Sequence, residues 1–211
     1  MNKLSRLTRN SLTIAFLFLF DKVIAFYRTR IITTQYSTDV QLLDTFNAAN
    51  NLPDVLFALI SGGALAMAFI PLLTEYLTTK DRAAAWDLFS RVANVAFLVT
   101  TSFAIVISIF AVPIAKLGIA PGFSDEQLAL LAELMRLNLI GTVIFSVSGL
   151  VAASLQANQH FIFPALAPSL YNVGQIIGAI YFVPRFGIRG LVYGVILGAG
   201  RGVARRVVVG D

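Results

Sequence analysis

The chain contains no cysteine and a single histidine, His160, among its 211 residues. Without cysteine it can form no disulfide and has neither a catalytic thiol nor a thiolate metal site. One histidine argues against a metal site built on several imidazoles and against a histidine-based catalytic triad. The sequence also has no P-loop or other nucleotide motif, and no pair of nucleophile and base stands out. It therefore predicts a protein that is not an enzyme and that uses neither cofactor nor metal.

Charge is scarce as well. Charged residues make up 13% of the chain, whereas a soluble domain carries roughly 25%. Hydrophobic residues account for 57% of the chain, and the mean hydropathy is +0.80. Apolar runs long enough to cross a bilayer recur through most of the sequence, which is typical of a polytopic membrane protein. The expected fold class is all-α, a bundle of about six transmembrane helices.

The formal net charge of +5 would suggest a nucleic-acid partner in a soluble protein. No segment interleaves basic and aromatic residues as nucleic-acid surfaces do, so we expect no nucleic-acid partner. The basic residues flank apolar runs and indicate contact with anionic lipid headgroups. The basic N-terminus and the apolar run after it resemble a signal peptide. No small-residue cleavage site follows, and Asp21 and Lys22 interrupt the run, so we predict a retained first membrane helix.

The stretch from Asp44 to Tyr76 opens with polar residues and then runs apolar for about twenty residues, the length that crosses a bilayer core. In a helix Asp44, Asn47 and Asn51 fall within about 60° of one another. Unpaired polar groups facing lipid cost several kcal/mol, so this face must meet water or other helices. The small residues 61–64 allow either close helix packing or bending.

The apolar runs predict membrane helices over residues 11–33, 43–77, 92–115, 128–155, 161–183 and from 191 onward. Ser124, followed by two acids and Gln127, predicts a capped start of the fourth helix. Within that helix, Glu133 and Arg136 are three residues apart and are expected to form a local ion pair.

In the fifth helix, Asn172 and Gln175 are also three apart and should face one interior. The sixth helix has only about ten apolar residues, too few to cross a bilayer core. We therefore divide the chain into a six-helix N-terminal lobe over residues 1–200 and a basic tail over residues 201–211, which is expected to be truncated or unnatural.

Alternating crossings place nine of the 16 lysines and arginines on one side and six on the other. The richer side is cytoplasmic by the positive-inside rule, so both ends of the chain are expected in the cytoplasm. Asp21 and Lys22 lie near the middle of the first helix, and a charge there is a functional-site hypothesis by default. The alternative is that both charges only neutralise partners on neighbouring helices. Arg28, seven residues after Asp21, shares the face of Asp21.

The stretch over residues 42–76 resembles the second helix of the MviN/MurJ-type lipid II flippase family. The matching residues are Asp44, Phe46, Ala49, Leu52, Pro53, Gly63, Ala68, Phe69, Pro71, Leu73, Glu75 and Tyr76. The APGF of residues 120–123 and the run over residues 161–173 are similar to a family loop and to a family IPAFAP-x-LLN run. The family belongs to the multidrug/oligosaccharidyl-lipid/polysaccharide exporter superfamily, whose members have two six-helix lobes facing a central cavity. The resemblance implies that this chain is the N-terminal lobe alone.

The resemblance further implies flipping of lipid II, a peptidoglycan precursor linked to undecaprenyl pyrophosphate, from the inner to the outer leaflet of the bacterial cytoplasmic membrane. Lys22 falls where the family usually has an arginine, and Arg28 matches a second arginine. Asp44 matches a family acid near the outer end of the cavity. Two features depart from the family, because Phe57-Ala58 replaces its paired arginines and Gly62 replaces an acid. The partners implied are the anionic lipid-linked substrate, membrane lipids and a missing C-terminal lobe.

From the residues themselves we predict substrate binding by Lys22, Arg28, Asn47 and Asn51, and the resemblance adds Asp44 to this set. Asp21 and Asp44 are candidates for ion coupling. A cavity lined by such cations and amides would lower the cost of moving a charged headgroup. The alternatives are an exporter of another polyprenyl-linked oligosaccharide or of a small cationic drug, and a non-transporting scaffold of cell-wall synthesis. A cavity dominated by acids would favour a cationic substrate, and a bundle without a cavity would favour the scaffold.

Overall fold

The computed structural model describes residues 6–59 and 64–208, and these residues form helices joined by short turns, with no strand among them. The elements are α1 (Arg6–Gln35), α2 (Val40–Phe57), α3 (Ala64–Thr79), α4 (Arg82–Ile109), α5 (Ala111–Ile114), η2 (Ala115–Ile119), α6 (Asp125–Ala157), α7 (Ile162–Ile177), η3 (Gly178–Phe182), α8 (Val183–Phe186) and α9 (Arg189–Val208). The elements η2 and η3 are π-helical turns.

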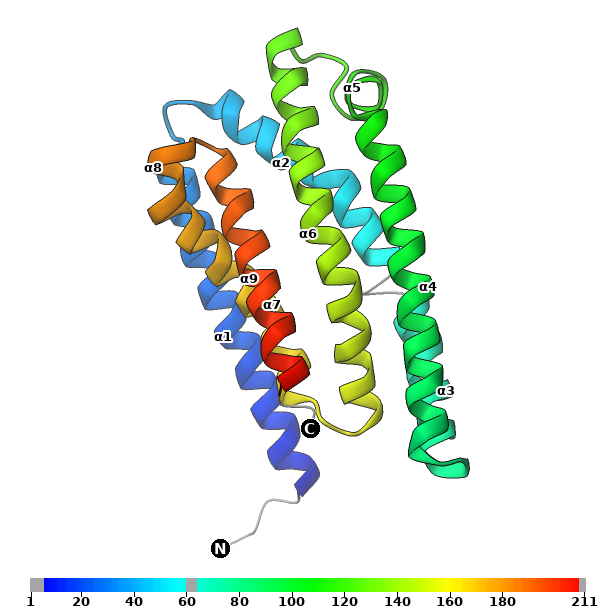
Figure 1. Ribbon diagram of the computed structural model, residues 1–211. Helices are drawn as coiled ribbons and strands as arrows, with labels where there is room; N and C mark the ends of the chain where they lie inside the picture. The colour runs from blue at the N-terminus through cyan, green and yellow to red at the C-terminus, as the bar shows by residue number, and fades with distance from the viewer. Residues whose placement is uncertain (1–5, 60–63, 209–211) are drawn as a thin grey trace, which may run out of the picture.

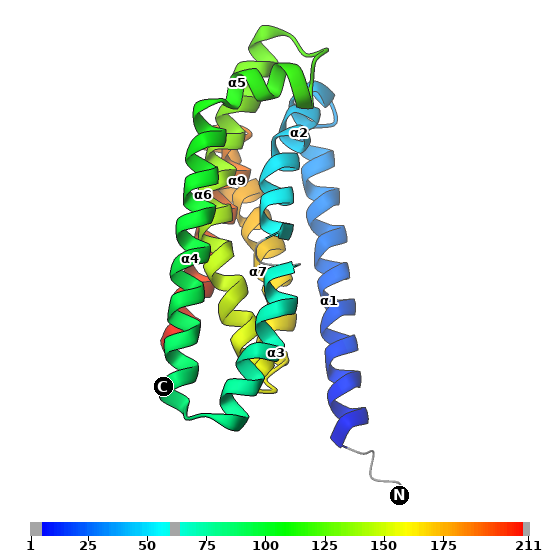
Figure 2. The ribbon, with the colours of Figure 1, turned by 90° about the vertical axis from the view of Figure 1, so that its right-hand side faces the viewer.

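The helices run roughly side by side between two ends of the molecule (Figures 1 and 2). The described elements pass between these two ends six times. The six passes are α1, α2 with α3, α4, α6, α7 with η3 and α8, and α9. The connections α1–α2, η2–α6 and α8–α9 lie at one end, and α3–α4 and α6–α7 lie at the other (Figure 1). This alternation agrees with the expected six-helix bundle.

Helix α6 lies at the centre of the bundle and packs against α2, α3, α4 and α9. Its largest fully buried side chains are Leu131, Leu134, Met135, Leu139 and Leu150. A helix that contacts several neighbours buries apolar residues on more than one of its faces. Leu131, Leu134 and Met135 belong to one core cluster, which reaches α2 and α9, and Leu139 and Leu150 to another, which reaches α3 and α4.

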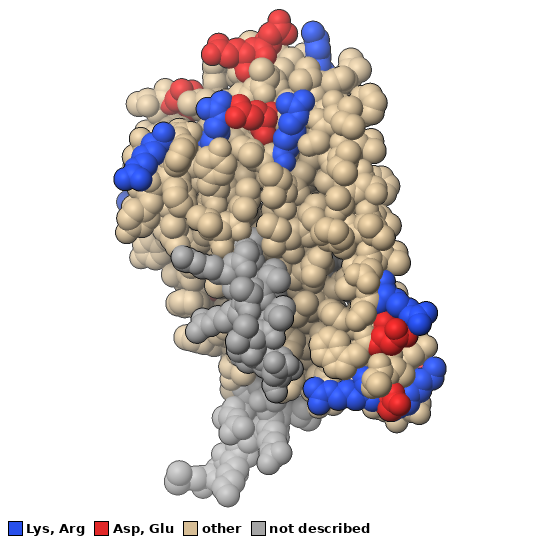
Figure 3. All heavy atoms as spheres, in the orientation of Figure 1, with Lys and Arg blue, Asp and Glu red and all other residues tan. Residues whose placement is uncertain are grey.

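The outer surface is suited to lipid. Three described helices are long and apolar enough to cross a membrane by length and composition, over Arg82–Ile109, Asp125–Ala157 and Pro164–Phe186. Large apolar side chains lie exposed on α1 and α4, among them Phe16, Leu19, Leu98 and Phe103. Charged side chains gather near the two ends of the face in Figure 3, with a broad uncharged surface between them. Apolar surface of this extent fits a bilayer core rather than water.

The second predicted helix corresponds to α2 and α3, and residues 60–63 between them lie outside the described part of the chain. Residues 43–77 were expected to form one helix, but α2 ends at Phe57 and α3 begins at Ala64. Ala58 and Leu59 form a π-helical turn, and the small-residue cluster over 61–63 lies outside the described residues. Pro53 lies inside α2 without ending it.

The third helix also begins earlier than predicted. The charged residues 82–91 were assigned to a connection, but they form the first turns of α4. Asp81 caps this helix, since its carboxylate accepts a hydrogen bond from the Ala84 amide at 2.7 Å. Arg91 and Asp87 form an ion pair at 2.9 Å with i,i+4 spacing. Charges so spaced are compatible with a helix that extends beyond the apolar region.

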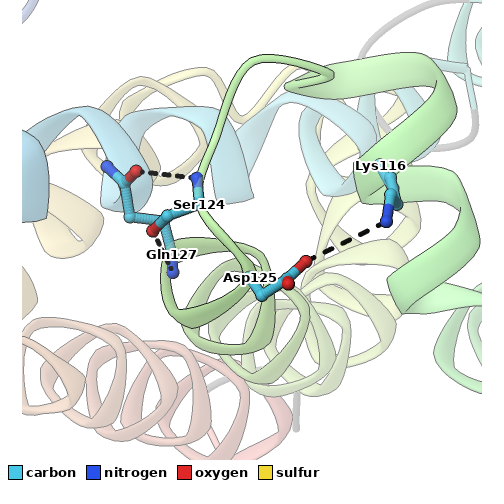
Figure 4. A network of polar contacts seen from close by, with 4 residues as sticks. All are labelled: Lys116, Ser124, Asp125 and Gln127. Carbon is cyan, nitrogen blue, oxygen red and sulfur yellow. Dashed lines mark hydrogen bonds and ion pairs between the residues drawn. The ribbon is translucent and has the colours of Figure 1, made fainter.

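The predicted start of α6 is confirmed. Ser124 Oγ accepts from the Gln127 amide at 3.3 Å, and the Ser124 amide donates to Gln127 Oε1 at 3.1 Å (Figure 4). This capping box satisfies two amide donors that the first turn of a helix would otherwise leave unpaired. Lys116 Nζ lies 3.9 Å from Asp125 Oδ1 across the η2–α6 connection, between two exposed side chains.

The predicted ion pair between Glu133 and Arg136 is wrong. Glu133 instead binds Arg189 at the start of α9 through two hydrogen bonds, Nε to Oε1 at 2.5 Å and Nη2 to Oε2 at 2.6 Å. Arg136 donates from Nε to the Ser108 carbonyl of α4 at 2.9 Å. A planar guanidinium matches a carboxylate in this two-bond geometry better than an i,i+3 neighbour on the same helix can. The two arginine contacts thus tie α6 to α9 and to α4.

Glycines allow α7 and α9 to pack backbone against backbone. A Cβ atom added to Gly194 would overlap the Gly174 carbonyl oxygen and lie 2.7 Å from Gly178 Cα. A Cβ on Gly178 would lie 2.6 Å from the Gly190 carbonyl oxygen. Small residues at such spacing are the usual means by which membrane helices approach closely. The sixth helix was expected to stop near residue 200, but the helical backbone of α9 continues to Val208.

The alternation of connections predicts a labelling pattern. In single-cysteine variants of this cysteine-free chain, a membrane-impermeant maleimide should label Ser37→Cys and Gly122→Cys on intact cells. It should label Thr79→Cys and Asn158→Cys only after permeabilisation. All four positions are exposed, and they lie in or beside connections at opposite ends of the bundle. Labelling of Thr79→Cys and Ser37→Cys from the same side would contradict this topology.

Candidate functional site

A cavity of about 950 Å³ opens between α1, α2, α6 and α7, with further contributions from α3 and α9. Its volume lies at the upper end of the range typical of small-molecule sites. The polar and charged residues of its wall are Asp21, Lys22, Arg28, Asn47, Asn50, Asp54, Asn138, Thr142, Ser148, Gln156, Tyr171, Asn172 and Gln175. Apolar residues, including Phe57, Met67, Ile70 and Phe145, line the rest.

Two cations of α1 border the cavity. Lys22 is exposed and forms no ion pair with any carboxylate of the described residues. Arg28 is half-buried and donates from Nη1 to Asn172 Oδ1 at 2.9 Å. Its Nε is buried without a hydrogen-bond partner among the described residues. The two cations are six residues, or about 9 Å, apart along the helix and point about 120° apart.

Asp21 is the most buried charged group of the cavity wall, with 4% of its surface exposed. Its Oδ1 accepts from Ser169 Oγ at 3.1 Å and from Asn172 Nδ2 at 2.9 Å. Both donors are neutral, come from α7 and bind the same carboxylate oxygen of Asp21. Asn172 therefore contacts Asp21 with its amide nitrogen and Arg28 with its amide oxygen.

Amide side chains connect the other helices of the cavity wall. Asn138 of α6 donates from Nδ2 to Asn50 Oδ1 of α2 at 3.0 Å, and Asn50 Nδ2 donates to the Phe46 carbonyl at 2.8 Å. Gln175 donates to the Tyr171 hydroxyl at 3.0 Å. The prediction that Asn172 and Gln175 face one interior is confirmed, because both are buried and both line the cavity.

The structure brings together some of the predicted substrate-binding residues and leaves others apart. Lys22, Arg28 and Asn47 line the cavity, as does Asp21. Asp44 and Asn51 are exposed and do not belong to its wall. The stripe of α2 that faces the cavity is centred on Asn50, and Asn51 points about 100° away from it. The polar face predicted from Asp44, Asn47 and Asn51 therefore differs by a rotation about the helix axis from the face of α2 that lines the cavity.

The contribution of α6 was missed at the sequence level. Its cavity-facing residues are Asn138, Gly141, Thr142, Phe145, Ser148, Gly149, Ala152, Ala153 and Gln156. They recur at intervals of three and four, so a helical-periodicity search for small and polar residues could have found this stripe. The stripe is hard to recognise because it mixes polar residues with small apolar ones, and α6 carries the charged Glu133 and Arg136 on another face.

Aromatic rings form a row across the cavity wall. Phe57 and Phe145 pack edge to face with centroids 6.0 Å apart, and Phe145 lies 5.9 Å from Tyr171. Such arrangements are the preferred geometry of aromatic pairs. Phe57 stands where the resemblance described above leads one to expect an arginine, so part of the expected cationic wall is apolar in this chain.

A family model described as "Lipid II flippase MurJ" matches residues 39–205. The chain belongs to the MurJ family. Among curated relatives, the "Probable lipid II flippase MurJ" of Buchnera aphidicola subsp. Schizaphis graminum is 26% identical over 194 residues, which are 90% of this chain and 37% of that protein. The "Lipid II flippase MurJ" of Burkholderia cenocepacia is 28% identical over 196 residues, 91% of this chain and 38% of that protein.

A solved structure supports the fold of this MurJ family member. The structure titled "Lipid II flippase MurJ, inward closed conformation" superposes with a TM-score of 0.76 at 23% identity, over 93% of this chain and 41% of that one. The chain thus spans well under half the length of the MurJ proteins it matches.

Proposed function

We propose that this chain forms the N-terminal lobe of a flippase that moves lipid II from the inner to the outer leaflet of the bacterial cytoplasmic membrane by alternating access. Both ends of the lobe would lie in the cytoplasm. The observation that carries the proposal is a cavity within a MurJ-family helix bundle that presents Lys22 and Arg28, neither of which forms an ion pair with a described carboxylate.

The physical argument concerns the two halves of the substrate. A polyprenyl pyrophosphate has an anionic headgroup that loses water on entering the membrane and a tail that prefers lipid. Lys22 and Arg28 can replace the lost water with charge-assisted hydrogen bonds. Asn47 adds an amide on the α2 side of the cavity. Asp44 and Asn51 lie outside the cavity wall. They could bind the substrate only in another conformation, in which α2 turned them toward the cavity.

The alternatives fit the site less well. A scaffold without transport activity would not need a cavity of about 950 Å³. A cationic substrate would need a wall dominated by acids, but the wall holds two acids, Asp21 and Asp54, beside two cations. Acids therefore do not outnumber cations in this wall, and Oδ1 of Asp21 already accepts hydrogen bonds from Ser169 and Asn172.

Energy input would come from an ion gradient or from the membrane potential, because the sequence offers no nucleotide-binding motif. Asp21 is the stronger of the two candidates for ion coupling, since it lies on α1 at the cavity and accepts hydrogen bonds from Ser169 and Asn172 of α7. Asp44 is exposed outside the cavity wall.

A chimera tests the proposed function. This lobe would replace the matching part of the Burkholderia cenocepacia relative, and the purified chimera would be placed in liposomes containing fluorescent lipid II. We expect movement of lipid II across the bilayer above the rate in protein-free liposomes. A chimera that inserts and is monodisperse but moves no lipid II would contradict the proposal.

The 211-residue chain by itself should not flip lipid. It supplies one of the two lobes between which the central cavity of such a flippase would lie, and alternating access requires two bodies that move against each other. The measurement is growth of a flippase-depleted bacterium that expresses this chain alone, with the chimera as the positive control. Restored growth by the chain alone would show that one lobe suffices.

A further inference from the structure

We propose that Asn172 is a positioning residue that holds the guanidinium of Arg28 in the cavity while keeping it from pairing directly with Asp21. The ligand assigned to Arg28, an anionic lipid pyrophosphate, rests on the proposed function. The positioning itself rests only on the geometry of three side chains, Asp21, Asn172 and Arg28.

The chemistry of the neighbours determines the orientation of the Asn172 amide. A carboxylate only accepts hydrogen bonds, and a guanidinium only donates them. The amide satisfies both with Nδ2 toward Asp21, at 2.9 Å, and Oδ1 toward Arg28, also at 2.9 Å. The reversed amide would place NH₂ against the guanidinium and oxygen against the carboxylate. The orientation with Nδ2 toward Asp21 is therefore strongly favoured, and in it Oδ1 accepts the hydrogen bond that holds Arg28.

Burial makes this arrangement rigid. Asn172 is 5% exposed and Asp21 is 4% exposed, so water does not compete freely for either group. An arginine side chain loses considerable rotamer freedom when it binds a ligand, and a side chain held beforehand loses less at that moment. The bond from Asn172 occupies one N–H of Nη1, Nη2 donates to Thr29 Oγ1 at 3.4 Å, and Nε is buried. The second N–H of Nη1 and the second N–H of Nη2 remain for an anion.

The amide also separates two charges that could otherwise meet. Asp21 and Arg28 are seven residues apart on the same face of α1, within reach of a long arginine side chain. A direct pair would offset the positive charge that an anionic headgroup needs. With Asn172 between them, Arg28 forms no ion pair with a carboxylate of the described residues.

Ser169 provides a matched control within the same network. Its hydroxyl donates to the same Oδ1 of Asp21, at 3.1 Å, and its side chain is equally buried at 5% exposed. It comes from the same helix as Asn172 but makes no hydrogen bond to Arg28. A purely structural role in joining α1 to α7 would be shared by both residues. Arg28 is held from α7 by Asn172 and not by Ser169, and its other side-chain contact, from Nη2 to Thr29 Oγ1 at 3.4 Å, lies within α1.

The first test needs no ligand. The 211-residue chain in nanodiscs is treated with phenylglyoxal, which modifies guanidinium groups, and the modification rate of Arg28 is followed by peptide mass spectrometry. We expect Asn172→Leu, similar in size but unable to hydrogen-bond, to raise this rate several-fold. Ser169→Ala should change the modification rate of Arg28 by no more than about twofold, because Ser169 makes no hydrogen bond to Arg28. If the leucine variant does not accumulate, Asn172→Ala, which adds no atoms, carries the same expectation.

The second test is a double-mutant cycle on binding of farnesyl pyrophosphate to the same nanodiscs. Asn172→Leu should weaken binding up to about tenfold, because Arg28 then loses its rotamer freedom only when the ligand binds. The same change should have no effect in an Arg28→Ala background, because two residues acting through one group are not additive. Ser169→Ala should bind as the unmodified chain does.

The outcomes separate the positioning role from the proposed function. Three results would each overturn the positioning role. The first is an effect of Ser169→Ala as large as that of Asn172→Leu, and the second is an unchanged Arg28 modification rate in Asn172→Leu. The third is that Asn172→Leu weakens binding in the Arg28→Ala background as much as it does in the unmodified chain. If the unmodified chain binds no farnesyl pyrophosphate but Asn172→Leu still accelerates Arg28 modification, positioning stands and the proposed anion site fails.

Discussion

Lys22→Ala and Arg28→Ala are each expected to abolish lipid II flipping in the chimera that carries this lobe, while the protein still inserts and folds. Each change removes a cation of the cavity wall that forms no ion pair with a described carboxylate. A charged hydrogen bond to a desolvated phosphate contributes about 1.5–3 kcal/mol, so its loss slows transport at least tenfold. The measurement is the rate of fluorescent lipid II movement in liposomes.

Two controls accompany this prediction. Lys22→Arg should keep most of the activity, since the charge is retained. Arg30→Ala changes an exposed cation of the same helix that is not part of the cavity wall, and it should flip normally. If the alanine variants of Lys22 and Arg28 transport normally, or fail only because they do not accumulate, the cations are structural and the anion-binding argument is refuted.

The structural alternative for these cations is a local pair between Lys22 and its neighbour Asp21. The observed contacts of Asp21 run to Ser169 and Asn172 of α7 instead. Lys22 consequently retains its charge at the cavity wall. This leaves the charge free to meet an anion, which is what the alanine variants are designed to test.

Gly194→Ala is expected to destabilise the bundle by about 1–3 kcal/mol or more, the range for overfilling a packed interface. The added Cβ would overlap the Gly174 carbonyl and lie 2.7 Å from Gly178 Cα. Both neighbours are backbone, so α7 and α9 would have to separate. The measurement is thermal unfolding in detergent, followed by fluorescence-detected gel filtration.

Gly141→Ala is the matched control for that change. Gly141 also lies inside a helix, but its added Cβ meets side-chain atoms of Val195 and Ile196 at 3.8 and 3.9 Å, which is ordinary contact. Because alanine favours a helix over glycine by up to about 1 kcal/mol, this variant should be unchanged or slightly stabilised. Equal melting temperatures for the two variants would refute the close packing of α7 on α9.

Local signals in the sequence were sufficient for several features of this protein. Low charge and repeated apolar runs predicted an all-helical membrane bundle, because a bilayer core admits only helices or closed barrels. The order of residues from Ser124 to Gln127 predicted the start of α6, because a capping box involves neighbours within one turn. The positions of Lys22 and Arg28 on the first helix, and the family resemblance of residues 42–76, were likewise available from the sequence.

Tertiary structure alone decided which side chains meet. Glu133 binds Arg189 rather than Arg136, and Asn172 joins Asp21 to Arg28 across two helices more than 140 residues apart in the chain. The cavity stripe of α2 centres on Asn50 because that residue faces Asn138 of α6. Periodicity defines the faces of a helix, but it carries no information on which face a neighbouring helix will cover. Those choices depend on how the helices pack, and here they depend on the backbone contact that glycine permits between α7 and α9.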